Sequence, residues 1–290
     1  MSERAGLFYF SGTSNTELVA ELYKAELESH GAAVDLMRIE DLLREDKRPD
    51  TESYSLIGVG YVIHALNAPR IVYEFIEKLP TADGKKVFLF KCPGDAFMEG
   101  GATSMIRGRL KGRGYGVFHE TLVVMPSNVA VRWGDDVVLK LHSIASGRVK
   151  AAVAEILSGR SRLQENPLHS RIASRLFSLG ETLGARLFGR LHLRASSACN
   201  LCGKCVRECP TKNIRMEKGK ILFGWDCILC LRCVYGCPVN AISPIGFGAM
   251  VIKPYRKTRN IIEEKDPNEV YHADRARNLF TPAMNRYLKG

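Results

Sequence analysis

The chain has 290 residues, of which 46% are hydrophobic and 25% are charged, and its formal net charge is +11. At roughly 150 residues per domain this length predicts about two domains, and the composition excludes collagen-like and disordered chains. No stretch approaches the ~18 uninterrupted apolar residues of a membrane helix. The apolar run at residues 7–10 is too short for the core of a signal peptide, so we expect a cytoplasmic location.

Residues 1–159 alternate short apolar runs with helical patterns. Their spacing predicts strands at 7–10, 33–37, 55–60, 87–90 and 117–125, and helices at 16–30, 69–79, 103–111 and 135–157. Strands that alternate with helices in this way predict an α/β fold, a doubly wound parallel five-stranded sheet with helices on both faces. Ligands bind such sheets beyond the carboxyl ends of the strands.

The turn at residues 11–16 follows the first expected strand and leads directly into a helix. Small and hydroxylated residues at such a turn let backbone amides and hydroxyls surround a phosphate, and the helix N-terminus adds partial positive charge. The turn matches neither G-x-G-x-x-G nor G-x-x-x-x-G-K-S/T, which disfavours dinucleotides and nucleoside triphosphates. A plain helix N-cap is the alternative. The candidate phosphate-binding residues are Ser11, Gly12, Thr13, Ser14, Asn15 and Thr16.

This turn resembles the FMN phosphate loop of flavodoxins, S-x-T-G-N-T, with Ser14 in place of the usual glycine. The resemblance implies FMN as a cofactor, and in flavodoxin-like sheets FMN lies at the switch point between strands one and three. The loops after strands three, four and five are then the candidates for contact with the flavin. Their candidate residues are Tyr61, Val62, Ile63, His64, Ala65, Asn67, Cys92, Pro93, Gly94, Asp95 and Asn128.

Four of these residues also have ordinary structural interpretations. His64 is either a cover for the flavin or a solvated loop histidine, and Cys92 is either a redox-active thiol or inert packing. Asp95 and Asn128 either contact the edge of the flavin ring or only stabilise the turns in which they lie. Many flavodoxin relatives carry an aromatic residue where His64 or Leu66 stands, so the sequence does not identify a stacking partner for the ring.

The connector at residues 160–195 has seven basic and two acidic side chains. Apolar residues recur in it at three- or four-residue spacing, which predicts a basic amphipathic helix interrupted at Gly180 or Gly184. We expect its apolar stripe to pack against a domain, and association with a membrane surface is the alternative. The stripe consists of Ile172, Leu176, Leu179, Leu183, Leu187 and Leu191.

Eight of the nine cysteines lie at residues 199–237, in two copies of C-x2-C-x2-C-x3-C-P that are 28 residues apart. Two-residue spacing aims three thiolates at one iron–sulfur cube, and in the bacterial two-cluster ferredoxin pattern the fourth cysteine ligates the other cluster. Paired C-x2-C motifs also suit structural zinc, which is the alternative. The predicted ligands are Cys199, Cys202, Cys205 and Cys237 for cluster one, and Cys227, Cys230, Cys233 and Cys209 for cluster two.

The pattern around these motifs predicts a small α+β domain at residues 196–245. Residues 215–223 are expected to form a hairpin around Gly219, because glycine suits a tight turn. A final segment at residues 246–290 is expected to wrap over both domains. The short apolar shell around the clusters should be formed by Ile214, Ile221, Ile228 and Ile242.

Taken together, the chain resembles fusion proteins that join a flavodoxin-like domain to a bacterial two-cluster ferredoxin, over about residues 1–245. The resemblance implies electron transfer through two 4Fe-4S clusters and FMN. An oxidoreductase that reduces a quinone or another small acceptor, and a redox or iron sensor, are the alternatives.

The basic excess lies outside residues 1–159, which have 19 basic and 21 acidic side chains. Part of that excess would neutralise the charges of the clusters and of the FMN phosphate. The remainder favours an acidic redox partner protein or an anionic membrane surface. No nucleic-acid-binding module accompanies it, so we do not expect nucleic-acid binding.

Overall fold

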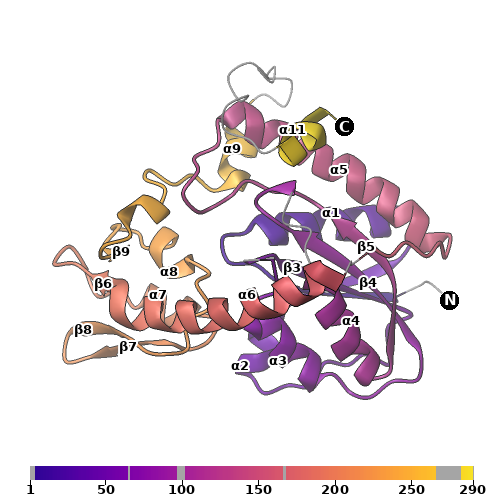
Figure 1. The fold of residues 1–290 in the computed structure, drawn as a ribbon, viewed down its shortest axis with the longest axis horizontal. Coiled ribbons are helices and arrows are strands. Elements are labelled where there is room, and N and C mark those ends of the chain that lie inside the picture. Colours follow the sequence, from indigo (N-terminus) through magenta and orange to yellow (C-terminus); the bar gives the residue numbers. More distant parts are fainter. Residues whose placement is uncertain (1–3, 65, 97–101, 166–167, 266–281, 290) are drawn as a thin grey trace.

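A computed structural model describes residues 4–64, 66–96, 102–165, 168–265 and 282–289 (Figure 1). The first half folds around one parallel sheet in the order β2-β1-β3-β4-β5, which is the flavodoxin-like order and confirms the predicted fold class. The chain order reverses between β1 and β3, so a crevice opens at their carboxyl ends. The strands are β1 (Arg4–Phe10), β2 (Ala33–Arg38), β3 (Leu56–Val62), β4 (Lys85–Cys92) and β5 (Tyr115–Leu122).

Helices cover both faces of this sheet (Figure 1). On one face α1 (Asn15–Ser29) packs beside α5 (Asp135–Leu157), and α3 (Arg70–Lys78) packs beside α4 (Ala102–Gly112) on the other. Each interface has its own apolar core, because the strands of a sheet covered on both faces send apolar side chains both ways. The short helix α2 (Ile39–Arg44) was not predicted, since its six residues follow β2 without a separating turn.

The connector forms one long helix, α6 (Leu168–Leu187), that continues into the π-helical turn η2 (Phe188–His192). The helix runs through Gly180 and Gly184 without a break, so the predicted interruption is wrong. A glycine weakens a helix only modestly, and 20 residues supply enough other hydrogen bonds to continue through two of them. In Figure 1, α6 extends from the parallel sheet to the second domain.

Strand β6 (Leu193–Ala195), at the end of the connector, pairs antiparallel with β9 (Ile242–Pro244) of the second domain. The predicted hairpin is present as β7 (Ile214–Glu217) and β8 (Lys220–Phe223). Lys218 and Gly219 both have positive φ at its turn, as a two-residue primed turn requires. Ile214 and Ile242 are buried in this domain's core, and Ile221 packs against them.

The C-terminal segment returns to the first domain. After the 3-10 turn η3 (Gly248–Met250), helices α9 (Thr258–Glu264) and α11 (Pro282–Lys289) pack against α5. Ile261 and Met284 enter the core there. Within the described ranges, no helix combines the length and the apolar character needed to cross a membrane.

Candidate functional site

A cavity of about 230 Å³ lies at the carboxyl ends of β1, β3, β4 and β5, which is where a doubly wound sheet binds its ligand. Its wall includes most of the residues that the sequence singled out for FMN. The predicted residues that line it are Ser11, Gly12, Thr13, Asn15, Thr16, Val62, Ile63, His64, Cys92, Pro93, Gly94 and Asn128.

Four of the predicted residues lie elsewhere in the described part of the chain. Tyr61 is fully buried in the core on the α3 and α4 side, because its position on β3 points it away from the crevice. Asn67 is also buried, and its Oδ1 accepts a hydrogen bond from the Tyr73 hydroxyl at 2.5 Å. Asp95 lies outside the cavity wall, and Ser14 lines a second pocket instead. Ala65 lies outside the described residues.

Ser14 adopts the left-handed conformation that glycine adopts most readily, with φ 75° and ψ 0°. This conformation suits the glycine of the flavodoxin pattern, and a non-glycine residue in it costs about 1–3 kcal/mol. Ser14 occupies the N-cap position of α1, yet its side chain makes no capping hydrogen bond. The hydroxyl thus leaves the first amides of α1 available to a ligand, which fits a phosphate site better than a plain N-cap.

The remaining loop side chains fix the cavity wall. Asn15 Nδ2 donates to the Pro126 carbonyl at 2.7 Å, and its Oδ1 accepts from the Thr258 hydroxyl at 2.7 Å. Asn128 Nδ2 donates to Thr13 Oγ1 at 3.0 Å. These bonds connect the loop after β1 with the loop after β5 and with the C-terminal segment. Asn15 therefore has a structural role, and the ligand would meet mainly backbone amides and hydroxyls.

The wall opposite the sheet comes from residues that the sequence did not indicate. Glu181 of α6 lies 3.5 Å from His64, measured from Oε1 to Nδ1, and Leu229 and Met250 add apolar surface. Within the described part of the chain the wall contains no Phe, Tyr or Trp, and His64 supplies its one aromatic ring. No local pattern could have found Glu181, Leu229 or Met250, because only the tertiary fold brings α6 and the second domain to the crevice.

The two cysteine motifs have the same backbone conformation as well as the same spacing. Leu201 and Gly203 in the first motif have positive φ, as do Leu229 and Leu231, which lie 28 residues further on. Helices α7 (Lys204–Glu208) and α8 (Arg232–Tyr235) follow at the same offset. A left-handed backbone conformation costs free energy for residues other than glycine. Its repetition at equivalent positions therefore indicates that the two loops have the same role.

The fourth cysteine of each motif is also held in an equivalent way. The amide of Asn213 donates to Cys209 Sγ at 3.3 Å, and the amide of Ala241, 28 residues later, donates to Cys237 Sγ at 3.2 Å. Hydrogen bonds from backbone amides to sulfur are among the features that set the reduction potential of an iron–sulfur cluster. The eight thiols form no disulfides. Among the described residues, no three Cys, His, Asp or Glu side chains converge on a position for a single metal ion.

Burial acts strongly on the thiols of the second motif. It raises the pKa of Cys227 to about 12 and the pKa of Cys230 to about 11. Without iron these thiols are neutral at pH 7, so ligation releases protons. Cys202 of the first motif is exposed, whereas Cys209 and Cys230 are buried.

The second motif packs directly against the phosphate loop. A Cβ on Gly12 would lie 2.6 Å from the backbone oxygen of Cys230, so only glycine allows this approach. Leu229 of the same motif lines the cavity, and no residue of the first motif does. The hydroxyl of Tyr235 donates to the Asn128 carbonyl at 2.6 Å, which connects α8 with the loop after β5.

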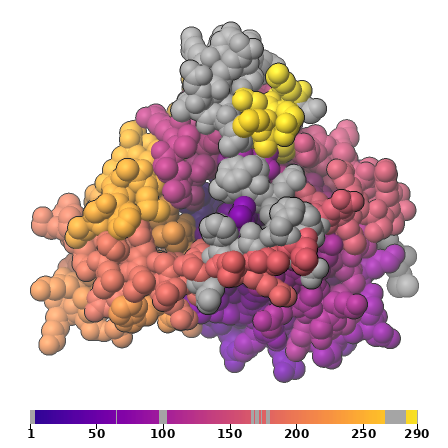
Figure 2. Space-filling model, viewed as in Figure 1, coloured from indigo at the N-terminus to yellow at the C-terminus, as the bar shows by residue number. Residues whose placement is uncertain are grey.

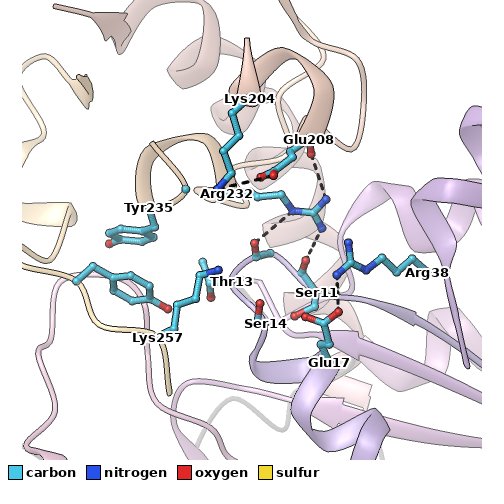
Figure 3. A pocket seen from close by; sticks show the side chains of 13 residues that line it. Ser11, Thr13, Ser14, Glu17, Arg38, Lys204, Glu208, Arg232, Tyr235 and Lys257 are labelled. Carbon is cyan, nitrogen blue, oxygen red and sulfur yellow. Dashed lines mark hydrogen bonds and ion pairs between the residues drawn. The ribbon is translucent and has the colours of Figure 1, made fainter. Parts of the chain in front are cut away.

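A second pocket of about 180 Å³ lies on the other side of the phosphate loop, against the second domain (Figure 3). Arg232 extends from α8 across this junction, and its Nη2 donates to the Ser11 carbonyl at 2.5 Å. Ser11, Gly12 and Thr13 line both hollows. The charged residues in the wall of this second pocket are the basic Arg38, Lys204, Arg232 and Lys257 and the acidic Glu17 and Glu208. Arg38 pairs with Glu17, Lys204 with Glu208 and Arg232 with Glu40, so most of these charges are neutralised within the protein.

Residues 192–238 match a family model described as a 4Fe-4S dicluster domain. No curated protein matches the chain in sequence. Among solved structures, the two-electron reduced flavodoxin of Megasphaera elsdenii is 26% identical, with a TM-score of 0.38, and the match covers 52% of this chain and 98% of that one. For oxidised flavodoxin 2 of Bacillus cereus the corresponding values are 22%, 0.39, 52% and 99%. The chain thus joins a flavodoxin-like sheet to a 4Fe-4S dicluster domain.

Proposed function

We propose that this chain transfers electrons between one-electron and two-electron redox chemistry, with two 4Fe-4S clusters and one FMN. The dicluster-domain match and the flavodoxin-like sheet support a redox role in electron transfer. When bound, iron–sulfur clusters exchange single electrons and flavin exchanges one or two. The observation that carries the proposal is the close approach of Gly12 to Cys230, because it joins the predicted phosphate loop to a predicted cluster ligand.

In this proposal the two cysteine motifs hold the clusters with crossed ligands. Cys227, Cys230, Cys233 and Cys209 hold cluster two, and Cys199, Cys202, Cys205 and Cys237 hold cluster one. The hydrogen bonds that backbone amides donate to Cys209 Sγ and Cys237 Sγ support equivalent roles for these two cysteines. The apolar residues around the motifs exclude water from the ligands.

The phosphate loop and the crevice hold FMN. Ser11, Gly12, Thr13 and the first turn of α1 would surround the phosphate, and the residues at the ends of β3, β4 and β5 would enclose the ring. Asn128 holds the Thr13 hydroxyl, and His64 pairs with Glu181 at the rim. These residues orient the cofactor and shield it from water.

The second cysteine motif packs closer to the crevice than the first. The second motif supplies Cys230 to the phosphate-loop contact and Leu229 to the cavity wall, whereas Cys202 of the first motif is exposed. We therefore place cluster one at the surface, where a partner protein docks. The exposed Arg207, Lys218 and Lys220 in the same domain favour an acidic redox partner.

Anaerobic purification with assays for iron, sulfide, zinc and acid-extractable flavin tests the cofactors. The ligand count predicts about eight iron atoms and one FMN per chain. Zinc in place of iron would exclude the clusters, and protein without flavin would exclude the role of the crevice while leaving the clusters intact. Turnover of a soluble quinone by the purified protein alone would favour an oxidoreductase over an electron carrier.

Single Cys→Ala variants test the crossed ligation. If the ligands cross, Cys209→Ala and Cys230→Ala damage the same cluster and leave the same electron paramagnetic resonance spectrum from the surviving one. Cys205→Ala and Cys237→Ala should form the second matching pair. Uncrossed ligation would instead pair Cys209→Ala with Cys205→Ala.

A further inference from the structure

Helix α6 crosses the front of the molecule in Figure 2, and the apolar side chains that the structure describes on one of its sides are exposed to solvent. Leu168, Leu176 and Leu183 are 68%, 69% and 60% exposed, and Ile172 and Leu187 are exposed as well. Their spacing of four, four, seven and four residues puts all five on one side of the helix. The expectation that this stripe packs against a domain is therefore wrong for these side chains.

Among the side chains that the structure describes, those on the opposite side of α6 that contact the protein are small or polar. Ser174 Oγ donates to the Leu66 carbonyl at 3.3 Å, Glu181 pairs with His64, and Ala185 is buried. A helix on the surface of a soluble domain normally has the reverse arrangement, with its apolar side inward and its polar side outward. The outward stripe thus requires a partner that contributes apolar surface.

The charge on this helix limits the choice of partner. Residues 168–192 have four arginines and one acidic residue, Glu181, which faces inward. Arg175 and Arg190 are exposed beside the stripe. The Arg190 guanidinium lies 5.8 Å from the centre of the Trp225 ring, and that indole is itself 52% exposed. Leucines and arginines on a helix, with an exposed tryptophan from the neighbouring loop after β8, are residue types found where a protein lies in a membrane interface.

We infer that α6 docks this protein on an anionic membrane surface, with the leucine stripe among the acyl chains and the arginines at the headgroups. An anionic surface attracts the basic residues beside the stripe, which adds to the binding that the apolar side chains provide. A second copy of the chain is the competing occupant. A two-fold dimer would pair the stripe with itself and bring the arginines of both copies together, which disfavours it.

Co-sedimentation of the anaerobically purified full chain with vesicles tests this inference. We expect binding to phosphatidylcholine mixed with phosphatidylglycerol and little binding to phosphatidylcholine alone. The double variant Leu176→Gln, Leu183→Gln should bind about tenfold more weakly or worse, because it removes two inserted side chains. Arg175→Gln with Arg190→Gln should weaken binding chiefly at low salt, where surface charges are least screened.

Met216→Gln with Leu222→Gln is the matched control, since both residues are exposed apolar side chains on the β7–β8 hairpin. It should bind as the unchanged chain does, and the cluster absorbance of each variant verifies folding. Absence of binding to the anionic vesicles would overturn the inference. So would sedimentation of the unchanged chain as a dimer that the two leucine substitutions dissociate, which would assign the stripe to a second copy.

Discussion

Arg232 of the second cysteine motif donates a hydrogen bond to Glu40 of the flavodoxin-like domain, with Nη2 and Oε1 2.5 Å apart. The Glu40 carboxylate is almost fully buried, and the same guanidinium also donates to the carbonyls of Ser11 and Gly12. One side chain thus connects the cluster loop with the end of β1. Burial favours the neutral form of Arg232, but the interactions with Glu40 and Cys230 together outweigh this effect and raise the arginine pKa.

The first prediction concerns this pair. Arg232→Ala leaves the Glu40 charge buried without its partner, which typically costs 3–5 kcal/mol, so we expect about that loss of stability. The urea midpoint of the anaerobic protein, followed by far-ultraviolet circular dichroism, measures it. Arg215→Ala is the control, because Arg215 is exposed and should change stability by about 0–1 kcal/mol. An unchanged midpoint for Arg232→Ala would contradict the assigned role.

The second prediction concerns the close approach at Gly12. In Gly12→Ala the new Cβ would meet the Cys230 backbone oxygen at 2.6 Å, so the cluster loop must move away from the phosphate loop. We expect slower reduction of the flavin from the clusters, measured by stopped-flow absorbance after mixing with dithionite. Gly147→Ala is the control, because its Cβ would meet no atom within 4 Å. Equal rates for Gly12→Ala and the unchanged chain would mean that this contact does not set the transfer distance.

Local sequence patterns predicted the sheet because each strand and helix has its own apolar period. The helices expected at 16–30 and 135–157 agree with α1 and α5 to within a residue. The cysteine repeat likewise indicated equivalent loops, since backbone shape follows from the same local residues. For Ser14 the pattern identified the position of the loop, while its left-handed conformation required the structure.

Sequence patterns alone could not predict the contacts between segments that are far apart along the chain. The period of α6 identified an apolar face but not its surroundings, and the structure buries Ser174 and Ala185 while exposing Leu176. Tyr61 and Val62 are adjacent on β3, yet only Val62 reaches the cavity, because neighbouring strand residues point to opposite faces. The role of Arg232 depends on two domains meeting, which no local pattern encodes.

The third prediction concerns the one cysteine outside the motifs. Cys92 lines the cavity but is buried, and burial raises its pKa from 9.0 to about 12. At pH 8 the thiol is therefore almost wholly protonated, and only the thiolate is a good nucleophile. We expect the anaerobic holoprotein to resist iodoacetamide at pH 8, with all nine cysteines labelled after unfolding with a chelator. Rapid labelling of the Cys92 peptide in the folded protein would show a reactive thiol instead.

The fourth prediction concerns Ser14, whose φ of 75° is natural for glycine and strained for serine. Ser14→Gly relieves strain of about 1–3 kcal/mol but adds about 0.5–1 kcal/mol of unfolded-state entropy, so we expect a net gain in stability and unchanged or tighter FMN binding. Ser14→Val places a β-branched residue in the same conformation and should distort the loop. Fluorescence titration of flavin-free protein with FMN measures both affinities. Since Ser14 does not line the cavity, its side chain is not expected to contribute a ligand contact. Weaker FMN binding by Ser14→Gly would show that the hydroxyl, rather than the backbone shape, serves the phosphate.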